Sequence, residues 1–171
     1  MTDLIILSIL LSGPHHGYAL KKRAALVLGK RELHNNLVYP LLKRFIRQGW
    51  VKVREAEGER GQTRQVYSLT AAGRSALIER LAEFNGTQAY SEDEFQMRVA
   101  FFSLLPADAR QRILDARSAV LNKQHEHLKA LQAQEELAGF NAEVVAFRAR
   151  QIHAELQWIR KLSGSKPRTR T

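Results

Sequence analysis

The sequence of 171 residues contains no cysteine. That absence excludes disulfide bonds, thiol nucleophiles and cysteine-ligated zinc, and it favours a reducing compartment. The chain also lacks a long hydrophobic run, because its longest apolar stretch, Leu4 to Leu11, is interrupted by Ser8 and falls far short of the ~20 residues that cross a bilayer. No basic leader or small-residue cleavage site accompanies that stretch. We therefore expect a cytosolic protein that does not use a membrane as partner.

Arrangements of catalytic and metal-binding residues are missing too. No Ser-His-acid order, glycine-rich phosphate loop or pair of carboxylates stands out, and the loop from Gly58 to Gly61 lacks the Lys-Ser/Thr that binds a nucleotide. His125 and His127 are two residues apart on an expected helix, so they point about 200° apart and cannot hold one ion. The pair His15 and His16 has no further ligand nearby. We expect no enzyme, no cofactor and no metal site.

Positive charge, by contrast, is abundant and unevenly placed. The chain has 27 Lys and Arg against 17 Asp and Glu, a net charge of +10. Residues 1–84 hold 14 basic and 7 acidic side chains (+7), whereas residues 85–171 hold 13 and 10 (+3). A basic N-terminal half favours a polyanionic partner through counterion release. Charge alone does not choose between DNA, RNA and an anionic membrane.

The hydrophobic periodicity divides the first half into short elements. It predicts helices over residues 2–12, 17–28 and 35–48, then a β-hairpin from Trp50 to Leu69, then a helix capped by Thr70 and reaching about Glu83. Gly49 is expected to end the third helix as a left-handed cap. Three helices, a two-stranded β-hairpin wing and a further helix predict a winged helix-turn-helix over residues 1–84.

The third of these helices is amphipathic and basic. At about 100° per residue its apolar side chains share one side. They are Leu37, Val38, Leu41, Leu42 and Phe45. The other side carries Asn36, Pro40, Lys43 and Arg47. Such a helix, beside a basic hairpin, has the shape and charge to enter a DNA groove.

The second half is expected to be helical, giving a mainly α protein. Asn85 to Gln88 is the predicted domain boundary, followed by helices over residues 92–105, 106–136 and about 140–162. We expect a coiled-coil-like dimerisation domain over residues 85–162 and a disordered basic tail over residues 163–171. The apolar residues at heptad spacing are the candidate dimer contacts. They are Leu114, Leu121, Leu128, Val145, Ile152, Leu156 and Ile159. Packing of the two long helices against each other within one chain explains the same spacing.

Several motifs in order resemble the PadR family of bacterial transcriptional regulators. They are Gly13-Pro14-His15-His16-Gly17-Tyr18, Val38-Tyr39-Pro40, Gly49-Trp50-Val51 and Tyr67-Ser-Leu-Thr70-Ala-Ala-Gly73. The resemblance spans roughly residues 4–81. The second half, beginning with Phe95 to Pro106, is similar to the dimerisation domain of the longer, virulence-activator-like members. Where the family has Ser-Pro-Gly-Thr before its recognition helix, this chain has Leu33 to Leu37, and Val38 replaces the usual leucine.

The resemblance implies a homodimer that binds an inverted-repeat operator in double-stranded DNA, with repression favoured over activation, in the cytoplasm and on the nucleoid of a bacterium. The candidate DNA-binding residues are Asn35, Asn36, Tyr39, Lys43, Arg47, Arg60 and Arg64. Asn36 can contact adenine or cap the helix, and Asn35 is the favoured cap. Tyr39 can contact the DNA backbone or anchor its helix. Arg64 can reach the minor groove or pair with an acid across the hairpin.

The resemblance also implies a small-molecule effector. Five aromatic residues are candidates for its pocket, in a groove between the two domains, although aromatic residues at helical spacing more often form core. They are Phe95, Phe101, Phe102, Phe140 and Trp158. The rival function is a protein-interaction adaptor that keeps the winged helix without binding a specific DNA sequence.

Overall fold

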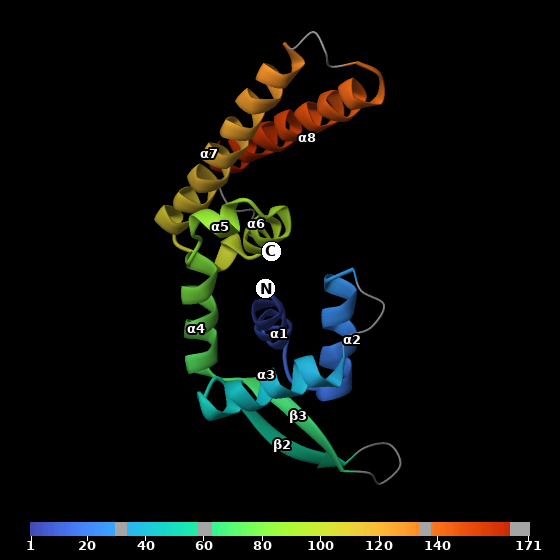
Figure 1. Ribbon diagram of the computed structural model, residues 1–171. Coiled ribbons are helices and arrows are strands. Elements are labelled where there is room, and N and C mark those ends of the chain that lie inside the picture. Colours follow the sequence, from blue (N-terminus) through green and yellow to red (C-terminus); the bar gives the residue numbers. More distant parts are fainter. Residues whose placement is uncertain (30–33, 58–62, 134–137, 165–171) are drawn as a thin grey trace. The chain divides into compact units, whose positions relative to one another are not determined.

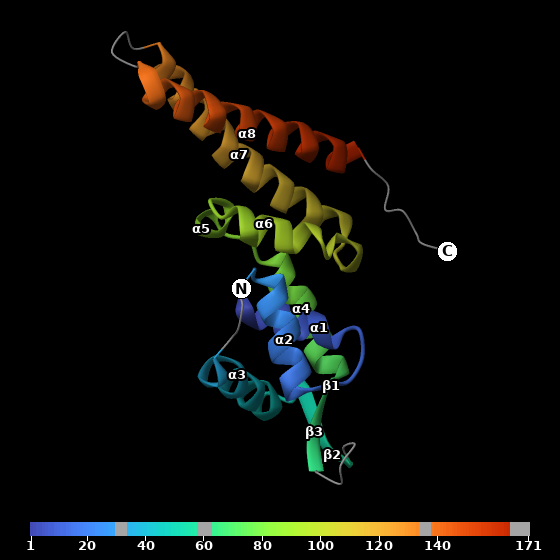
Figure 2. The ribbon, with the colours of Figure 1, turned by 90° about the vertical axis from the view of Figure 1, so that its right-hand side faces the viewer.

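The computed structural model describes residues 1–29, 34–57, 63–133 and 138–164, and Figures 1 and 2 show the chain in two views. It forms two compact units, Met1–Leu81 and Ala82–Thr171. The first ends three residues before the predicted boundary at residue 84. None of the helices within the described residues is both long and apolar enough to span a bilayer.

Three helices build the core of the first unit. They are α1 (Thr2–Leu10), α2 (Gly17–Val27) and α3 (Asn35–Arg47). In α1 apolar residues occur all around the helix, and Ile6 and Leu7 are fully buried. In α3 only one stripe is buried, formed by Val38, Leu42 and Phe45. This spacing of four and three residues is the one expected when one side of a helix packs on a core.

The sheet of this unit has three strands, one more than the predicted hairpin. Strands β2 (Val51–Glu57) and β3 (Thr63–Leu69) pair antiparallel, and the two-residue strand β1 (His15–His16) pairs with the other edge of β3. His15 lies opposite Tyr67, and His16 lies opposite Val66. The sequence around the two histidines reads as a turn, because two residues carry no alternation by which a strand could be recognised.

Helix α4 (Ala71–Ala82) leaves the sheet directly after β3. Thr70 caps it as predicted: its Oγ1 accepts a hydrogen bond from the Gly73 N–H (3.0 Å) and donates one to the carbonyl of Gly49 (2.7 Å). Gly49, with φ of 71°, follows the end of α3 in the left-handed conformation that favours glycine. One threonine therefore joins the end of the third helix to the start of the fourth.

The second unit is helical throughout its described residues. It contains α5 (Gly86–Ala89), α6 (Glu92–Val99), a 3-10 turn η1 (Phe102–Leu104), α7 (Ala107–Gln132) and α8 (Gly139–Gly164). The predicted turn at Asn85 is a one-turn helix closed by a capping box, in which the side chains and N–H groups of Asn85 and Gln88 pair reciprocally. The predicted helix over 92–105 stops at Val99. The predicted tail lies outside the described residues, except that Ser163 and Gly164 belong to α8.

Helices α7 and α8 run antiparallel, side by side in Figures 1 and 2. Leu114 and Leu121 of α7 and Ile152 and Ile159 of α8 are buried at their contact. Beside this apolar seam the guanidinium of Arg117 donates two hydrogen bonds to the Glu155 carboxylate, at 2.8 and 2.9 Å. The heptad spacing is therefore used, at least in these four residues, for packing within one chain.

Candidate nucleic-acid interface

The outward side of α3 carries an unbroken row of polar side chains. Asn36, Tyr39, Lys43 and Arg47 follow one another at intervals of three or four residues, and all four are exposed. Within the described residues no carboxylate pairs with Lys43 or Arg47. We call these four residues the α3 face. The Asn36 amide and the Tyr39 hydroxyl lie toward the start of α3, and the cations of Lys43 and Arg47 lie further along. These groups suit a surface that binds nucleic acid.

The start of α3 differs from the prediction. The N-cap is His34, with extended backbone angles and no side-chain hydrogen bond, so Asn35 is the first helical residue and not the cap. The Asn35 side-chain oxygen accepts a hydrogen bond from the Lys21 ammonium at 3.3 Å. Asn36 is exposed and makes no cap, which leaves its amide free for another partner.

A charged cluster holds α3 against its neighbours. The Asp3 carboxylate of α1 lies 2.8 Å from the Arg80 guanidinium of α4 and 3.9 Å from that of Arg44 in α3. Burial alone would raise the pKa of Asp3, but the N-terminal ammonium, the Leu4 N–H and the charge of Arg80 lower the pKa below its ordinary value. Arg80 also lies over the Trp50 ring (5.0 Å), and Trp50 stacks on Phe45 (5.7 Å). These contacts fix the inner side of α3 so that its outer side is presented as a rigid surface.

Of the predicted wing residues, only Arg64 can be placed. It is exposed on β3 opposite Ala56, and within the described residues it has no acidic partner. Of the two roles open to Arg64, pairing with an acid across the hairpin is not found among the described residues, and contact with the minor groove stays a prediction. The tip of the wing, with Arg60, lies outside the described residues. Lys52 and Arg54 of β2 are exposed as well and add positive charge to the hairpin.

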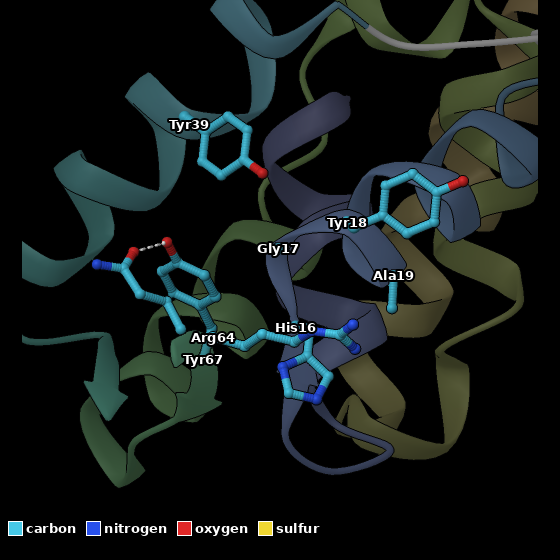
Figure 3. A pocket seen from close by; sticks show the side chains of 8 residues that line it. His16, Gly17, Tyr18, Ala19, Tyr39, Arg64 and Tyr67 are labelled. Carbon is cyan, nitrogen blue, oxygen red and sulfur yellow. Dashed lines mark hydrogen bonds between the residues drawn. The ribbon is translucent and has the colours of Figure 1, made fainter. Parts of the chain in front are cut away.

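A hollow of about 670 Å³ lies where the start of α2, α3 and β3 meet (Figure 3). Its lining includes Tyr18, Tyr39, Tyr67 and Arg64. Tyr39 is 36% exposed, and Figure 3 shows its hydroxyl pointing toward Gly17. The hollow thus offers hydroxyl and guanidinium donors beside the α3 face, and such donors bind phosphate oxygens.

Gly17 is what lets Tyr39 lie so close to α2. A Cβ on Gly17 would stand 3.0 Å from Tyr39 Cε1 and 3.3 Å from Tyr67 Cε2. In the sequence this glycine stands out only as part of a family motif. The close approach could not be read from the sequence, because it joins residues that are 22 and 50 positions apart.

Tyr67 is the second residue that the sequence analysis did not place in the site. Its hydroxyl donates a hydrogen bond to the Gln65 side-chain oxygen at 2.7 Å. Burial, and then the neighbouring Tyr39, raise the pKa of Tyr67 above its ordinary value. The phenol therefore stays protonated at neutral pH, and its one hydrogen is used in the bond to Gln65. The alternation of Val66, Tyr67 and Leu69 assigned this residue to a strand but not to a binding surface.

The five candidate aromatic residues for an effector pocket do not line one common pocket. Phe95 is fully buried and packs edge-on against Trp158, with ring centroids 5.8 Å apart. Phe140 is 91% exposed and lies 18 residues before Trp158 on α8, about 27 Å along the helix. Phe101 and Phe102 are half-buried around η1. A pocket that includes both Phe140 and Trp158 is therefore ruled out by distance.

The candidate dimer residues are likewise used inside the chain. Leu114, Leu121, Ile152 and Ile159 are buried in the contact of α7 with α8, while Leu128, Val145 and Leu156 are half-buried. The alternative of antiparallel packing within one chain accounts for the four buried residues. Among the described residues, no three His, Asp or Glu side chains gather in a way that could hold a metal ion.

Four helices, of which α3 has an exposed basic side, and a β-hairpin paired with a short third strand define a winged helix-turn-helix domain. Residues 6–79 match the profile of the transcriptional regulator PadR-like family, and this N-terminal domain is a PadR-like domain. Among curated proteins none matches the sequence.

Solved structures of three similar proteins span different shares of the chain. A protein of Thermoplasma acidophilum described as a transcriptional regulator is 34% identical over 46% of this chain and 75% of its own, with a TM-score of 0.43. A PadR family transcription regulator from Clostridium difficile is 28% identical over 46% of this chain and 81% of its own, with a TM-score of 0.40. Bacillus subtilis PadR in complex with operator DNA is 21% identical over 95% and 96%, with a TM-score of 0.46.

Proposed function

We propose that this protein is a regulator of transcription that recognises a specific sequence in double-stranded DNA. The observation that carries the proposal is the α3 face, where Asn36, Tyr39, Lys43 and Arg47 are all exposed on a helix whose opposite side is locked into the core. A helix of this kind fits the major groove of B-form DNA, which is about 12 Å wide. The family of the N-terminal domain consists of transcriptional regulators.

The α3 face divides naturally into two kinds of contact. Asn36, in the first turn of α3, can make two hydrogen bonds to the N6 and N7 atoms of adenine. Lys43 and Arg47 are cations without an acidic partner in the described part of the chain, and they suit phosphates along the groove. Arg64 and the hollow beside Tyr39 extend that phosphate-binding surface toward the wing. We assign sequence preference to Asn36 and general affinity to the cations.

The functional unit proposed is a homodimer on an inverted-repeat operator. Two recognition helices about 34 Å apart would meet successive major grooves on one side of the duplex. The support comes from α8, where Phe140, Val144 and Phe147 are 91, 60 and 53% exposed at spacings of four and three residues. A second subunit would bury this row, which lies off the Ile152–Ile159 seam. We further propose that the dimer represses a nearby promoter in a bacterial cytoplasm. A small-molecule effector would relieve the repression.

The test is binding of the full chain to the promoter of its own operon and to random DNA over a salt series. We expect selective binding to the promoter. The logarithm of the binding constant should fall steeply with the logarithm of the salt concentration. Lys43→Ala should weaken binding to all sequences alike and reduce the salt slope by about one. Asn36→Ala should flatten the preference at one base position, at a cost of about 1–3 kcal/mol for the preferred base. Arg112→Ala, on α7, is the matched control for a lost exposed cation.

Two results would contradict this proposal. Equal, weak binding to promoter and random DNA would favour the adaptor that binds a protein through its winged helix. If the Asn36→Ala protein keeps its base preference, Asn36 does not recognise a base, and only the general contact with DNA remains proposed.

A further inference from the structure

A side-chain hydrogen bond joins α2 to the first residue of α3. The ammonium of Lys21 donates it to the side-chain amide of Asn35, at 3.3 Å. An ammonium has three donors and no acceptor, so the amide atom that meets it must be the oxygen. The bond therefore fixes which end of the Asn35 amide is used within the protein and which end is left for another molecule.

The end that is left can only donate. An asparagine that recognises adenine needs both ends of its amide, because the oxygen accepts from N6 and the nitrogen donates to N7. In Asn35 the oxygen is engaged by Lys21, and another donor approaching that oxygen would meet the positive charge of the ammonium. The two hydrogens on the nitrogen remain. Asn36 differs, since no such cation holds its amide in the described part of the chain.

Asn35 lies at the edge of the α3 face, on the side of Tyr39. The two residues are four positions apart, so they lie one above the other on the helix, and both are exposed. Lys21 lies one turn of α2 beyond Gly17, the residue that Tyr39 contacts. The first residues of a recognition helix are those that contact base edges. The donors of Asn35 are therefore well placed to meet a base.

The four bases differ in what they offer to a donor in the major groove. Guanine presents two acceptors, N7 and O6, and thymine presents one, O4. Adenine has its N6 amino group beside the acceptor N7, and cytosine presents the N4 amino group. A group that can only donate is therefore accommodated best by guanine and is opposed by the amino groups of adenine and cytosine.

We propose that Asn35 selects guanine at one position of each DNA half-site, and that Lys21 is the positioning residue that imposes this choice. The inference rests on the proposed binding of a specific DNA sequence. It adds a second base contact, of different chemistry, to the one assigned to Asn36. It concerns this chain in particular, because Leu33 to Leu37 are the residues that stand where the family has another motif.

The test compares Lys21→Met with Lys22→Met, its matched control at the next residue of α2. The parent protein, as the full chain, first selects its preferred duplex from random DNA, and each base pair of that duplex is then varied singly. For the parent we expect one position where guanine is preferred over adenine by about fivefold or more in dissociation constant. Asn35→Ala should remove the preference at this position.

The two lysine variants should differ only in base preference. Both lose one cation, so both should bind all sequences somewhat more weakly, with a smaller dependence on salt. In Lys21→Met the released oxygen can accept from adenine N6, and the ratio of guanine to adenine affinity should fall toward one. Lys22→Met should keep the parent ratio. Lys21→Arg, whose guanidinium also has donors only, should keep it as well. Thermal unfolding checks that each variant is folded.

A measurement without DNA tests the hydrogen bond itself. The side-chain amide resonances of Asn35 should shift in the NMR spectrum of Lys21→Met and stay in place in that of Lys22→Met. Unshifted resonances in Lys21→Met would mean that the bond does not hold the amide, and the inference would be wrong.

Three results with DNA would also overturn the inference. They are a parent without a guanine position that depends on Asn35, a Lys21→Met protein that keeps the guanine preference, and a Lys22→Met protein that loses it equally. A parent that binds promoter and random DNA alike would instead refute the proposed function, and this inference with it. The parent alone reveals that case, so the two failures are distinguishable.

Discussion

At the scale of single residues, the first unit depends on places where only glycine fits. Gly73 lies in the first turn of α4, directly against the carbonyl of Trp50. That carbonyl already accepts hydrogen bonds from the Thr70 N–H (3.0 Å) and the Thr70 hydroxyl (3.1 Å). The end of α3, the start of β2 and the start of α4 therefore meet at one oxygen atom, and no space remains for a side chain at position 73.

Gly73→Ala should consequently destabilise the protein by about 2–4 kcal/mol. Its Cβ would collide with the Trp50 oxygen and stand 2.8 Å from Leu69 Cδ1, so the backbone must move and the Thr70 cap is weakened. Urea unfolding at neutral pH measures the loss. Gly86→Ala is the matched control, because a Cβ there has open space, and it should change stability by less than about 1 kcal/mol. Equal stability of the two variants would show that the junction at Trp50 is looser than its geometry indicates.

At the scale of elements, α6 is held by a buried cation. Arg98 is 1% exposed, and its guanidinium donates to the Glu94 carboxylate (2.6 Å) and to the carbonyl of Glu83 (3.0 Å). It also lies over the Phe84 ring at 4.9 Å. A buried charge is tolerated only when it is paired and hydrogen-bonded, and here the pairing ties the segment after α4 to α6.

This pair predicts a specific dependence of stability on pH. Burial by itself raises the pKa of Glu94, but the hydrogen bond and charge of Arg98 outweigh it, and the pKa lies below its ordinary value of 4.5. A depressed carboxyl pKa contributes stability above the unfolded value, and that contribution is lost as the pH falls through the folded value. Glu94→Gln should therefore lose about 2–3 kcal/mol at pH 7, because it leaves a buried cation without its anion.

The difference between parent and Glu94→Gln should shrink when unfolding is measured at pH 3 and below. Asp108→Asn, which breaks the exposed pair with Arg112, is the control and should alter stability little at either pH. A Glu94→Gln deficit of the same size at pH 7 and at acid pH would mean that packing, rather than the ion pair, is responsible.

At the scale of the whole molecule, an apolar row on α8 stays exposed to solvent in the single chain. Phe140, Val144 and Phe147 are exposed, whereas the neighbouring seam at Ile152 and Ile159 is closed by α7. Contiguous exposed apolar side chains in a row mark surfaces that meet a partner. A second copy of the chain is the partner that an inverted-repeat operator requires.

Phe147→Glu should accordingly convert the proposed homodimer to a monomer without unfolding the chain, since the side chain is 53% exposed in a single chain. Analytical ultracentrifugation would show the change, and affinity for the two-site operator should fall toward that for one half-site. Leu26→Glu is the control: it places the same charge at an apolar residue that is 80% exposed on α2. If Phe147→Glu remains dimeric, the subunits meet through another surface.

The sequence alone determined those features that arise from neighbours within a few positions along the chain. The Thr70 cap and the left-handed Gly49 follow from local hydrogen bonding and backbone geometry, and the structure confirms them. Of the predicted apolar side of α3, Val38, Leu42 and Phe45 are buried and Leu41 is half-buried, but Leu37 is 39% exposed. The exposure of Asn36, Lys43 and Arg47 follows too, because fixing one side of a helix fixes the other, whereas Tyr39 became a candidate only through the family resemblance.

Tertiary structure decided every feature that depends on residues distant in sequence. It paired His15 and His16 with β3, placed Arg64 opposite Ala56, and set Tyr39 against Gly17. It also used the heptad leucines and isoleucines within one chain, which the spacing could not decide, because a seam looks the same whether its partner helix belongs to the same chain or to another. Periodicity specifies which side of an element is apolar, but only the packed chain specifies what that side meets.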